Sequence, residues 1–484
     1  MSTFGLYPAG HSPSQFASRS RTFHYLLKDK IEADFDSGAN TDLLGRRWFL
    51  VGGNLICFVG HLTIATARSA GAVTAGMTIV GFGAANCQMA AFALSELLPN
   101  KWRHLGVVFA DLATLVAVTV GPVTARYGYE SGTWRWNFYP VAILQALSFV
   151  GLYALYYPPK HPNGLPYAQA LREMDYIGTF QSFVFQQLRS NYVLGMLLFV
   201  LGSTPFLAGI IYTTIYPSSN IHVIACLVIG AIFLIAFALW ENIGFKRGLV
   251  KHPLTPSRIF IAGYGRDFTA PCIALAVVNM FYYSSSILWP TMINVFFLDD
   301  ASDWRYASVL STVQGLAILT GVIILSFTGS AIKRWNWQLS GYTLIMVVFG
   351  VLLALGTPQR KGMMIAFVFI SQAAYGASIY LCIAVSQMGV EQKDLGLSGG
   401  VSGTSRFAGG AIATAVYTAV LTNTVRDWTV KLVPAAAIAA GLPSDGVASL
   451  MEVLGTAHMT ADYSPAIVSA VGKATQGAYE HGIQ

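Results

Sequence analysis

Charged residues are scarce in this chain. Its 484 residues include 29 Lys and Arg and 22 Asp and Glu, so 11% of the sequence is charged and 54% is hydrophobic. Soluble globular domains carry charge on roughly 25% of their residues. The shortage of charge therefore excludes an ordinary water-soluble globule.

The sequence also lacks the motifs of ATP-driven pumps and of metalloproteases. It has no Gly-x-x-x-x-Gly-Lys sequence to cradle phosphates and no His-Glu-x-x-His sequence to bind zinc. Its five cysteines all lie inside apolar blocks and have no metal-ligand spacing. We therefore expect no enzyme activity, no cofactor and no metal site, and any pumping must use an ion gradient. The net charge of +7 reflects membrane topology rather than nucleic-acid binding.

Apolar blocks of about 20 residues fill most of the sequence, and this length crosses a bilayer core of about 30 Å. Such blocks predict an all-α, polytopic membrane protein whose partner is the lipid bilayer. We expect eleven spans, near residues 48–67, 73–96, 105–127, 135–157, 192–214, 221–240, 269–290, 307–329, 338–356, 363–386 and 395–421.

The basic residues predict the orientation of these spans. Cytoplasmic connections carry an excess of Lys and Arg, and alternate connections here are basic when Arg46 and Arg47 are placed in the cytoplasm. Arg360 and Lys361 are the exception, because they fall on the opposite side.

The stretch TDLLGRRWF places Asp42, Gly45, Arg46 and Arg47 directly before an apolar helix. Glycine permits a tight turn. The arginines and Asp42 can pair with each other or with helix ends in one conformation and separate in another. A simpler interpretation is a basic anchor on the cytoplasmic side.

Three further stretches carry distinctive patterns. GPVTARYGYESGTWRWNFYP holds Gly121 and Pro122 late in one span; Pro122 removes a helix hydrogen bond and predicts a bend there. AGMTIVGFGAANCQMAAFALSELLPNKWRH ends a span with Glu-Leu-Leu-Pro-Asn-Lys. LSGGVSGTSRFAGGAIATAVYTAVLTN is a glycine-rich span.

Together these four stretches resemble major facilitator superfamily transporters, and in particular the trichothecene-efflux-pump-like group of fungal fourteen-span drug–proton antiporters. The resemblance covers roughly residues 41–425. It implies a major facilitator fold, with Asp42 to Arg47 as the conformational-switch motif and Gly121 and Pro122 as the antiporter motif. Met77 stands where many drug antiporters have an arginine. The alignment further implies that family spans one, two and fourteen are missing, as in a truncated chain.

The resemblance divides the chain into five segments. These are a polar N-terminal tail (1–41), a partial N-terminal helical bundle (42–157), a cytoplasmic link with two extra spans (158–240), a C-terminal helical bundle (241–421) and an extracellular or lumenal tail (422–484).

Charged residues inside spans are candidate functional sites, because each costs about 2.5–3.5 kcal/mol near a helix centre. Asp111 is a candidate proton-binding carboxylate, although its position near the membrane interface equally fits a hydrated side chain. Arg406 lies among glycines that let a neighbouring helix pack closely, and it is either a functional charge or one member of a structural pair in the C-terminal bundle. Glu96 is a weaker candidate, since a salt bridge to the following loop explains it equally well. We expect His61 to be a hydrogen-bonded structural histidine.

A cavity for an organic substrate is mostly apolar and aromatic, with a few polar groups. Any one such residue can be ordinary packing, but the set is spread over both predicted bundles. The candidates are Asn86, Gln88, Asn279, Tyr282, Tyr283, Trp289, Gln314, Gln372 and Tyr375.

These features predict proton-coupled efflux of a fungal secondary metabolite or toxin by alternating access between two bundles. We expect a monomer in the plasma membrane, with protons and a small-molecule substrate as partners. Two alternatives remain open: a siderophore–iron transporter of the same fold, and a truncated membrane protein that transports nothing.

Overall fold

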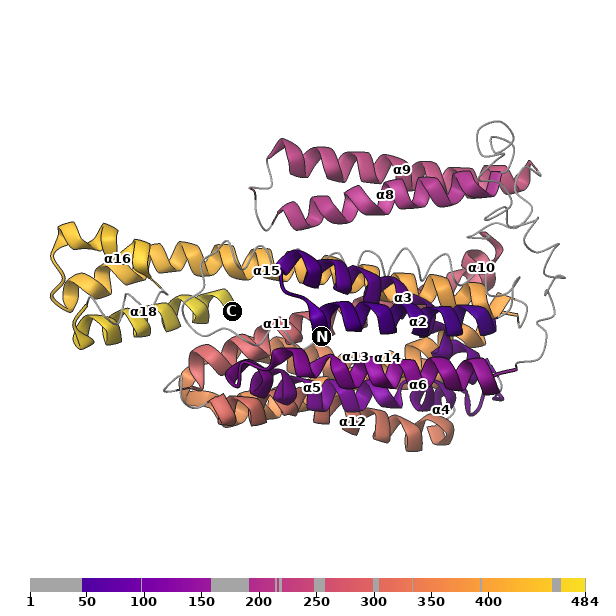
Figure 1. Ribbon diagram of the computed structural model, residues 1–484, viewed down its shortest axis with the longest axis horizontal. Coiled ribbons are helices and arrows are strands. Elements are labelled where there is room, and N and C mark those ends of the chain that lie inside the picture. The colour runs from indigo at the N-terminus through magenta and orange to yellow at the C-terminus, as the bar shows by residue number, and fades with distance from the viewer. Residues whose placement is uncertain are drawn as a thin grey trace.

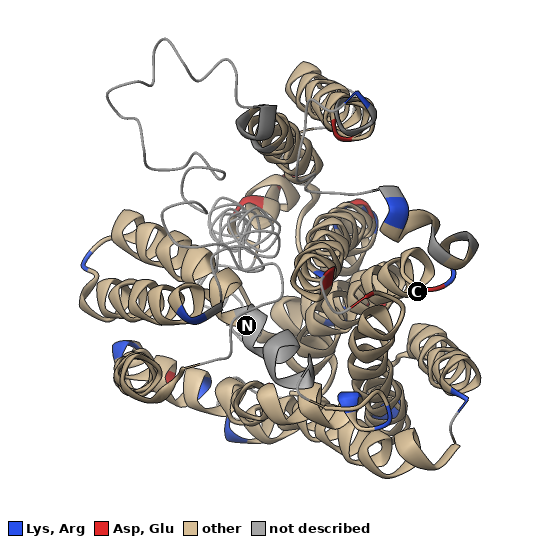
Figure 2. Cartoon of the chain, turned by 90° about the vertical axis from the view of Figure 1, so that its right-hand side faces the viewer, with Lys and Arg blue, Asp and Glu red and all other residues tan. Residues whose placement is uncertain are grey.

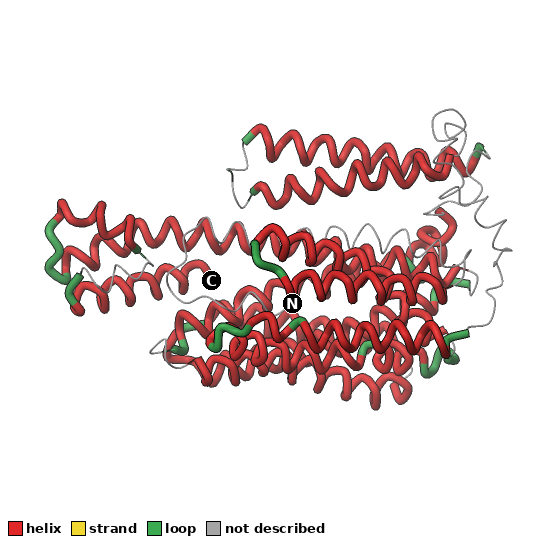
Figure 3. The backbone as a smooth tube through the Cα atoms, viewed as in Figure 1, coloured by secondary structure: helices red, strands yellow, loops and turns green. Residues whose placement is uncertain are grey.

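A computed structural model gives the architecture of the protein (Figure 1). It describes residues 46–96, 98–157, 191–213, 216, 220–247, 257–298, 304–332, 334–391, 394–454 and 463–483. Within these ranges every regular element is a helix (Figure 3), as the apolar blocks predict. The predicted tail 1–41, together with Asp42 and Gly45, lies outside the described residues.

The described helices follow one another along the chain. In order they are α2 (Arg46–Thr66), α3 (Ala70–Glu96), α4 (Arg103–Ala110), α5 (Leu112–Glu130), η2 (Trp134–Asn137), α6 (Tyr139–Leu155), α8 (Asn191–Tyr212), α9 (Ile221–Lys246), α10 (Ser257–Ile261), η4 (Ala262–Gly265), α11 (Thr269–Phe296), α12 (Trp304–Ile332), α13 (Trp335–Val351), η6 (Leu352–Leu355), η7 (Pro358–Arg360), α14 (Lys361–Met388), α15 (Leu395–Ala439), η9 (Ser444–Gly446), α16 (Val447–Val453) and α18 (Pro465–Ile483).

Eight described helices are long and apolar enough to cross a membrane, or nine if α4 and α5 form one bent span. The protein is therefore a multi-pass membrane protein. Two predicted spans fall short of the same standard: α8, whose apolar stretch Leu197–Tyr212 is shorter, and α15, which is rich in glycine, serine and threonine. The predicted count of eleven is thus not confirmed in the described ranges.

The helices form two halves. Helices α2 to α6 pack together as one half, and α11 to α15 as the other, with α14 in the middle against α11, α12 and α13. We call the end of the bundle where α2, α4 and α15 begin the basic end, because Arg47, Lys101 and Arg103 lie there. Figure 2 looks onto this end and shows charged residues at helix ends and connections, while the helix bodies are almost uncharged.

Glycines let α2 and α3 approach closely. A Cβ at Gly53 would lie 2.8 Å from Cβ of Asn86, and one at Gly83 would lie 2.7 Å from the backbone nitrogen of Cys57. In a membrane, small residues of this kind drive helix association because they bring two backbones into van der Waals contact.

Helices α8 and α9 form a hairpin beside the two halves (Figure 1). Gly195, Gly202 and Gly209 recur every seven residues on α8, and a Cβ on any of them would meet α9 at 2.6–2.9 Å. The hairpin touches the second half through α15, where Phe199 and Phe237 join one apolar cluster with Phe407.

Two arginines tie α2 and α6 together at opposite ends. Nη2 of Arg47, at the start of α2, donates to the carbonyl of Tyr153 in the last turn of α6 at 2.8 Å. Arg135, just before α6, donates from Nε (3.2 Å) and Nη2 (2.8 Å) to the carbonyl of Ala67, just after α2. Each cation satisfies a carbonyl that the partner helix leaves unpaired and complements the negative end of its dipole.

The first half contains one broken helix. The sequence predicts a single span over residues 105–127 with a bend at Pro122, but α5 runs unbroken through Pro122. The break lies at Asp111, where α4 and α5 meet at 44°. Asp111 has φ −100° and ψ 8°, outside the helical region, and aspartate favours such positions because its side chain competes with helical hydrogen bonds.

Helix α15 continues for 45 residues, well beyond the predicted boundary at residue 421. Its second part packs with α16 and α18 into a small extension with its own apolar cluster, including Val433, Leu450 and Val471 (Figure 1). Helix α18 runs back along α15, where the ring of His481 stacks on Trp428 with centroids 3.8 Å apart. Ile483, at its end, joins the cluster around Trp289 in the second half.

Candidate functional site

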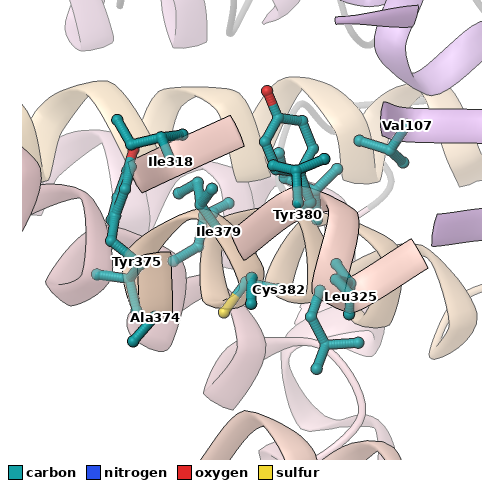
Figure 4. Close-up of a cluster of buried hydrophobic side chains, with 14 of the residues drawn as sticks. Val107, Ile318, Leu325, Ala374, Tyr375, Ile379, Tyr380 and Cys382 are labelled. Carbon is teal, nitrogen blue, oxygen red and sulfur yellow. The ribbon is translucent and has the colours of Figure 1, made fainter. Parts of the chain in front are cut away.

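The two halves meet along α4 and α5. In the middle of this contact, the hydroxyl of Tyr380 on α14 donates a hydrogen bond to Oδ2 of Asp111 at 2.6 Å. Figure 4 shows Tyr380 on α14, close to Val107 of α4. Further along, Gly315 of α12 lies so close to Thr119 of α5 that a Cβ on the glycine would be 2.5 Å from its Cα.

Asp111 is held in this place by the helix break. The break leaves Asp111 between two helix axes, and its side chain faces the second half although its backbone belongs to the first. Tyr380 is 4% exposed, so its hydroxyl has lost bulk water and the bond to a carboxylate replaces it. The charge of Arg406 on α15 also acts on Asp111 and on Tyr380.

Arg406 is positioned by the glycine-rich part of α15. Gly409 packs against the carbonyl of Ala276 on α11, and Gly410 packs against Tyr283 and Asn279. This close approach lets Nδ2 of Asn279 donate to the backbone carbonyl of Arg406 at 2.6 Å. The Arg406 side chain is half-buried, and its shielded Nε makes no hydrogen bond within the described residues.

Aromatic residues surround the guanidinium. Tyr282 and Tyr375 are stacked, with ring centroids 5.1 Å apart and 19° between their planes. The hydroxyl of Tyr375 donates to Oδ1 of Asn279 at 3.4 Å and interacts with Arg406. Tyr283 lies 5.4 Å from Tyr282 at 80°. These groups and the Asp111–Tyr380 pair form one cluster, which we call the central cluster: Asp111, Asn279, Tyr282, Tyr283, Tyr375, Tyr380 and Arg406.

Two of the predicted glutamines, Gln314 and Gln372, lie about one helical turn from residues of the central cluster or bind a residue that does. Nε2 of Gln314 donates to Oγ of Ser286 at 3.1 Å, one turn from Tyr282. Gln372 is fully buried one turn from Tyr375, and its amide makes no hydrogen bond to the described part of the chain.

Other predicted site residues lie elsewhere. Trp289 is 1% exposed, and its Nε1 donates to the carbonyl of Leu310, so it belongs to the apolar core. Asn86 donates to its own helix at Phe82 and packs on Gly53, at the contact between α2 and α3. His61 accepts or donates one bond within α2, to the carbonyl of Cys57.

The remaining predicted positions fall into two groups. The side chains of Arg46, Gln88 and Glu96 lie outside the described atoms. Gly121 and Pro122 lie in the middle of α5, away from its break.

The sequence did not single out Tyr380, Glu241 or His104. Tyr380 follows Tyr375 on the same buried helix, and this second phenol is the feature of the sequence that could have indicated it as a site residue. Glu241 is 3% exposed on α9, where a Cβ on Gly195 would lie 2.6 Å from its Oε1. His104 is fully buried between α4 and the second half.

The central cluster holds one carboxylate, one guanidinium and four phenols in a largely apolar surrounding. A carboxylate can bind and release a proton, and the phenols and guanidinium can donate hydrogen bonds to an organic molecule. The described residues contain no group of three or more side chains arranged to hold a metal ion.

The arrangement of the helices is similar to that of a solved membrane protein. The protein is similar to the human organic anion transporter MFSD10 (TETRAN), with a TM-score of 0.52 over 97% of this chain and 84% of that chain. The two sequences are 13% identical, so the likeness concerns the fold.

The family model of the fungal trichothecene efflux pump (TRI12) matches residues 33–479, which extends beyond both ends of the predicted resemblance. The protein therefore belongs to this family of membrane transporters and not to a family of enzymes. It is 54% identical to the MFS-type transporter prx5 of Penicillium rubens, over 88% of this chain and 75% of that one. It is 22% identical to the trichothecene efflux pump TRI12 of Fusarium sporotrichioides, over 88% of this chain and 68% of that one.

Proposed function

We propose that the protein exports a fungal secondary metabolite across the plasma membrane by alternating access, in exchange for protons. The observation that carries the proposal is the hydrogen bond between Tyr380 and Asp111, because it joins the two halves at a group that can be protonated. Relatives named as efflux transporters support the outward direction. Membership of the family supports a small organic molecule as substrate.

Asp111 is the proton site in this scheme. With Asp111 ionised, its carboxylate accepts the bond from Tyr380 and is attracted by Arg406, so the halves are held together at this level. A proton that enters from outside forms an O–H bond at Oδ2 and removes the negative charge. The attraction to Arg406 is then lost, and the halves can separate on the cytoplasmic side. Release of the proton to the cytoplasm restores the charge.

The tyrosines and Arg406 form the substrate side of the same cluster. The Tyr282–Tyr375 pair offers flat apolar surface, and the free Nε of Arg406 offers a hydrogen bond. A substrate that binds here competes with the electrostatic attraction between Arg406 and Asp111. Such competition for one charge couples substrate movement to proton movement.

Transport in a yeast that lacks its own drug exporters tests the proposal. Cells that produce the protein should tolerate more of a trichothecene or a related toxin than cells with an empty vector. Asp111→Asn should remove this tolerance, while Asp427→Asn, at a carboxylate that is 67% exposed, should keep it. Unchanged tolerance together with new uptake of iron–siderophore complexes would instead identify the siderophore transporter. No transport of either compound by correctly inserted protein would support the non-transporting alternative.

A further inference from the structure

Helix α4 is a short segment that stands apart from the helix it continues into. It has 8 residues and is bent by 44° from α5 at Asp111. Beyond the break, α5 is fixed to the second half by the close contact of Thr119 with Gly315. Arg126 of α5 also donates to Oδ1 of Asn294 at 2.8 Å. A change of angle at Asp111 therefore moves α4 without disturbing α5.

Helix α4 is attached to the second half at the basic end. Nη1 of Arg103 donates to the carbonyl of Gln387, in the last turn of α14, at 2.9 Å. The next residue, His104, is 0% exposed and lies between α12 and α13. A Cβ on Gly329 would be 2.7 Å from Nε2 of His104, so only glycine leaves room for the ring. The ring of Trp335 lies on its other side, with centroids 5.5 Å apart.

The site that holds His104 suits a neutral ring. Among the described residues, neither ring nitrogen makes a hydrogen bond of standard geometry, and the backbone of Ser326 is a polar group that faces the ring. An imidazolium in such a place would lose its hydration without gaining a counter-charge from the described side chains, which is costly. A proton therefore binds His104 far more readily when the ring has left this site.

We propose that α4 is the gate of the basic end, that the break at Asp111 is its hinge, and that His104 is a pH-sensitive latch which is seated when neutral and leaves its site when protonated. The proposal rests on the proposed transport function, since a gate serves a transporter. His104 and Asp111 are seven residues apart, which is about two helical turns or about 10 Å along the helix. The latch thus lies between the central cluster and the basic end.

The groups around His104 determine the sign of the pH effect. Trp335 faces it from α13, and Ser326 and Gly329 face it from α12. Arg103 is its neighbour on α4. The charged residues on the other packed elements are Arg334, directly before α13, and Glu96, at the end of α3; Asp111, Tyr375, Tyr380 and Arg406 belong to the central cluster. Burial disfavours an imidazolium in the seated position, because the ring there has lost its contact with water. Acid should therefore open the gate.

Distances between spin labels test the latch in the full chain, reconstituted in lipid nanodiscs with its native cysteines replaced by alanine. Labels at Phe109→Cys on α4 and Trp337→Cys on α13 report the gate, since both positions are exposed. Labels at Val116→Cys on α5 and Trp337→Cys are the matched control, because α5 stays packed on the second half. Exposed histidines titrate near pH 6.5. Below that value, the ratio of closed to open gate should fall by up to about tenfold per pH unit.

The variant His104→Phe keeps an aromatic ring but cannot take up a proton, so its gate should stay closed at pH 8 and at pH 5.5. Gly329→Ala should exclude the ring and open the gate at both pH values. The proposal would be overturned if the label distances in His104→Phe changed with pH as they do in the protein with His104. Equal distances at pH 8 and pH 5.5 in the protein with His104 would overturn it as well. These distances need no substrate. A protein that moves its gate but transports nothing would contradict the proposed function and leave the latch intact.

Discussion

The hydroxyl of Tyr380 donates a hydrogen bond of 2.6 Å to Oδ2 of Asp111, across 269 residues of sequence and across the boundary between the two halves. A carboxylate at this boundary gives the two halves an attraction that depends on charge. Arg406 increases that attraction from a third helix. In the proposed mechanism, the same three side chains connect proton binding with the relative position of the halves.

Removal of the Tyr380 hydroxyl should weaken the coupling without unfolding the protein. Tyr380→Phe keeps the ring in its buried site and deletes only the hydrogen bond to a charged acceptor, which contributes about 1.5–3 kcal/mol. We expect a roughly tenfold to hundredfold loss of proton-driven transport. The measurement is the initial rate in proteoliposomes with an imposed pH gradient. A rate equal to that of the original protein would show that Asp111 acts without Tyr380.

The shape of the Arg406 guanidinium should matter as well as its charge. Arg406→Ala should abolish transport, because the central cluster loses its cation. Arg406→Lys keeps the charge but loses the planar fork that reaches several partners, and we expect less than about a tenth of the transport rate. Arg426, which is 69% exposed, is the matched control, and Arg426→Ala should leave the rate unchanged. Full activity of Arg406→Ala would remove this residue from the site.

The arginine that precedes α6 should contribute measurably to stability. Arg135 donates two hydrogen bonds to the carbonyl of Ala67, and Arg135→Ala should destabilise the first half by about 1–3 kcal/mol. Arg47→Ala should cost less, since its one bond to Tyr153 is exposed to solvent. Thermal unfolding of the purified variants checks the order. A larger drop in midpoint temperature for Arg47→Ala than for Arg135→Ala would contradict this order.

The contact between α12 and α14 should tolerate no side chain at Gly321. A Cβ there would overlap the backbone carbonyl of Ala373, whereas a Cβ on Gly341 of α13 would meet no atom within 4 Å. We expect Gly321→Val to prevent accumulation of folded protein and Gly341→Val to have no effect. Size-exclusion chromatography of the solubilised variants distinguishes the two. Equal monodisperse yields would contradict the packing of these helices.

The sequence predicted the helical class and most of the spans, because blocks of about 20 apolar residues are a direct consequence of bilayer thickness. It placed Arg47 at a helix start but could not identify its acceptor, the carbonyl of Tyr153, which lies 106 residues away. Such pairs depend on tertiary packing, and local patterns contain no information about them.

Two local features depend on tertiary structure. Pro122 is the strongest helix-breaking signal in its span, yet α5 continues through it, and the 44° break lies at Asp111, which accepts a hydrogen bond from Tyr380 in the other half. Trp289 was predicted to line a cavity from its aromatic character. In the structure it is buried in an apolar cluster and donates a hydrogen bond to the carbonyl of Leu310. Sequence periodicity shows neither its burial nor this bond.

The most direct test of proton coupling compares two kinds of transport by Asp111→Asn in the same proteoliposomes. We expect the variant to exchange labelled for unlabelled substrate across the membrane, since that exchange needs no proton movement, and to show no net transport when a pH gradient is imposed. Net transport by Asp111→Asn at the rate of the original protein would contradict the account.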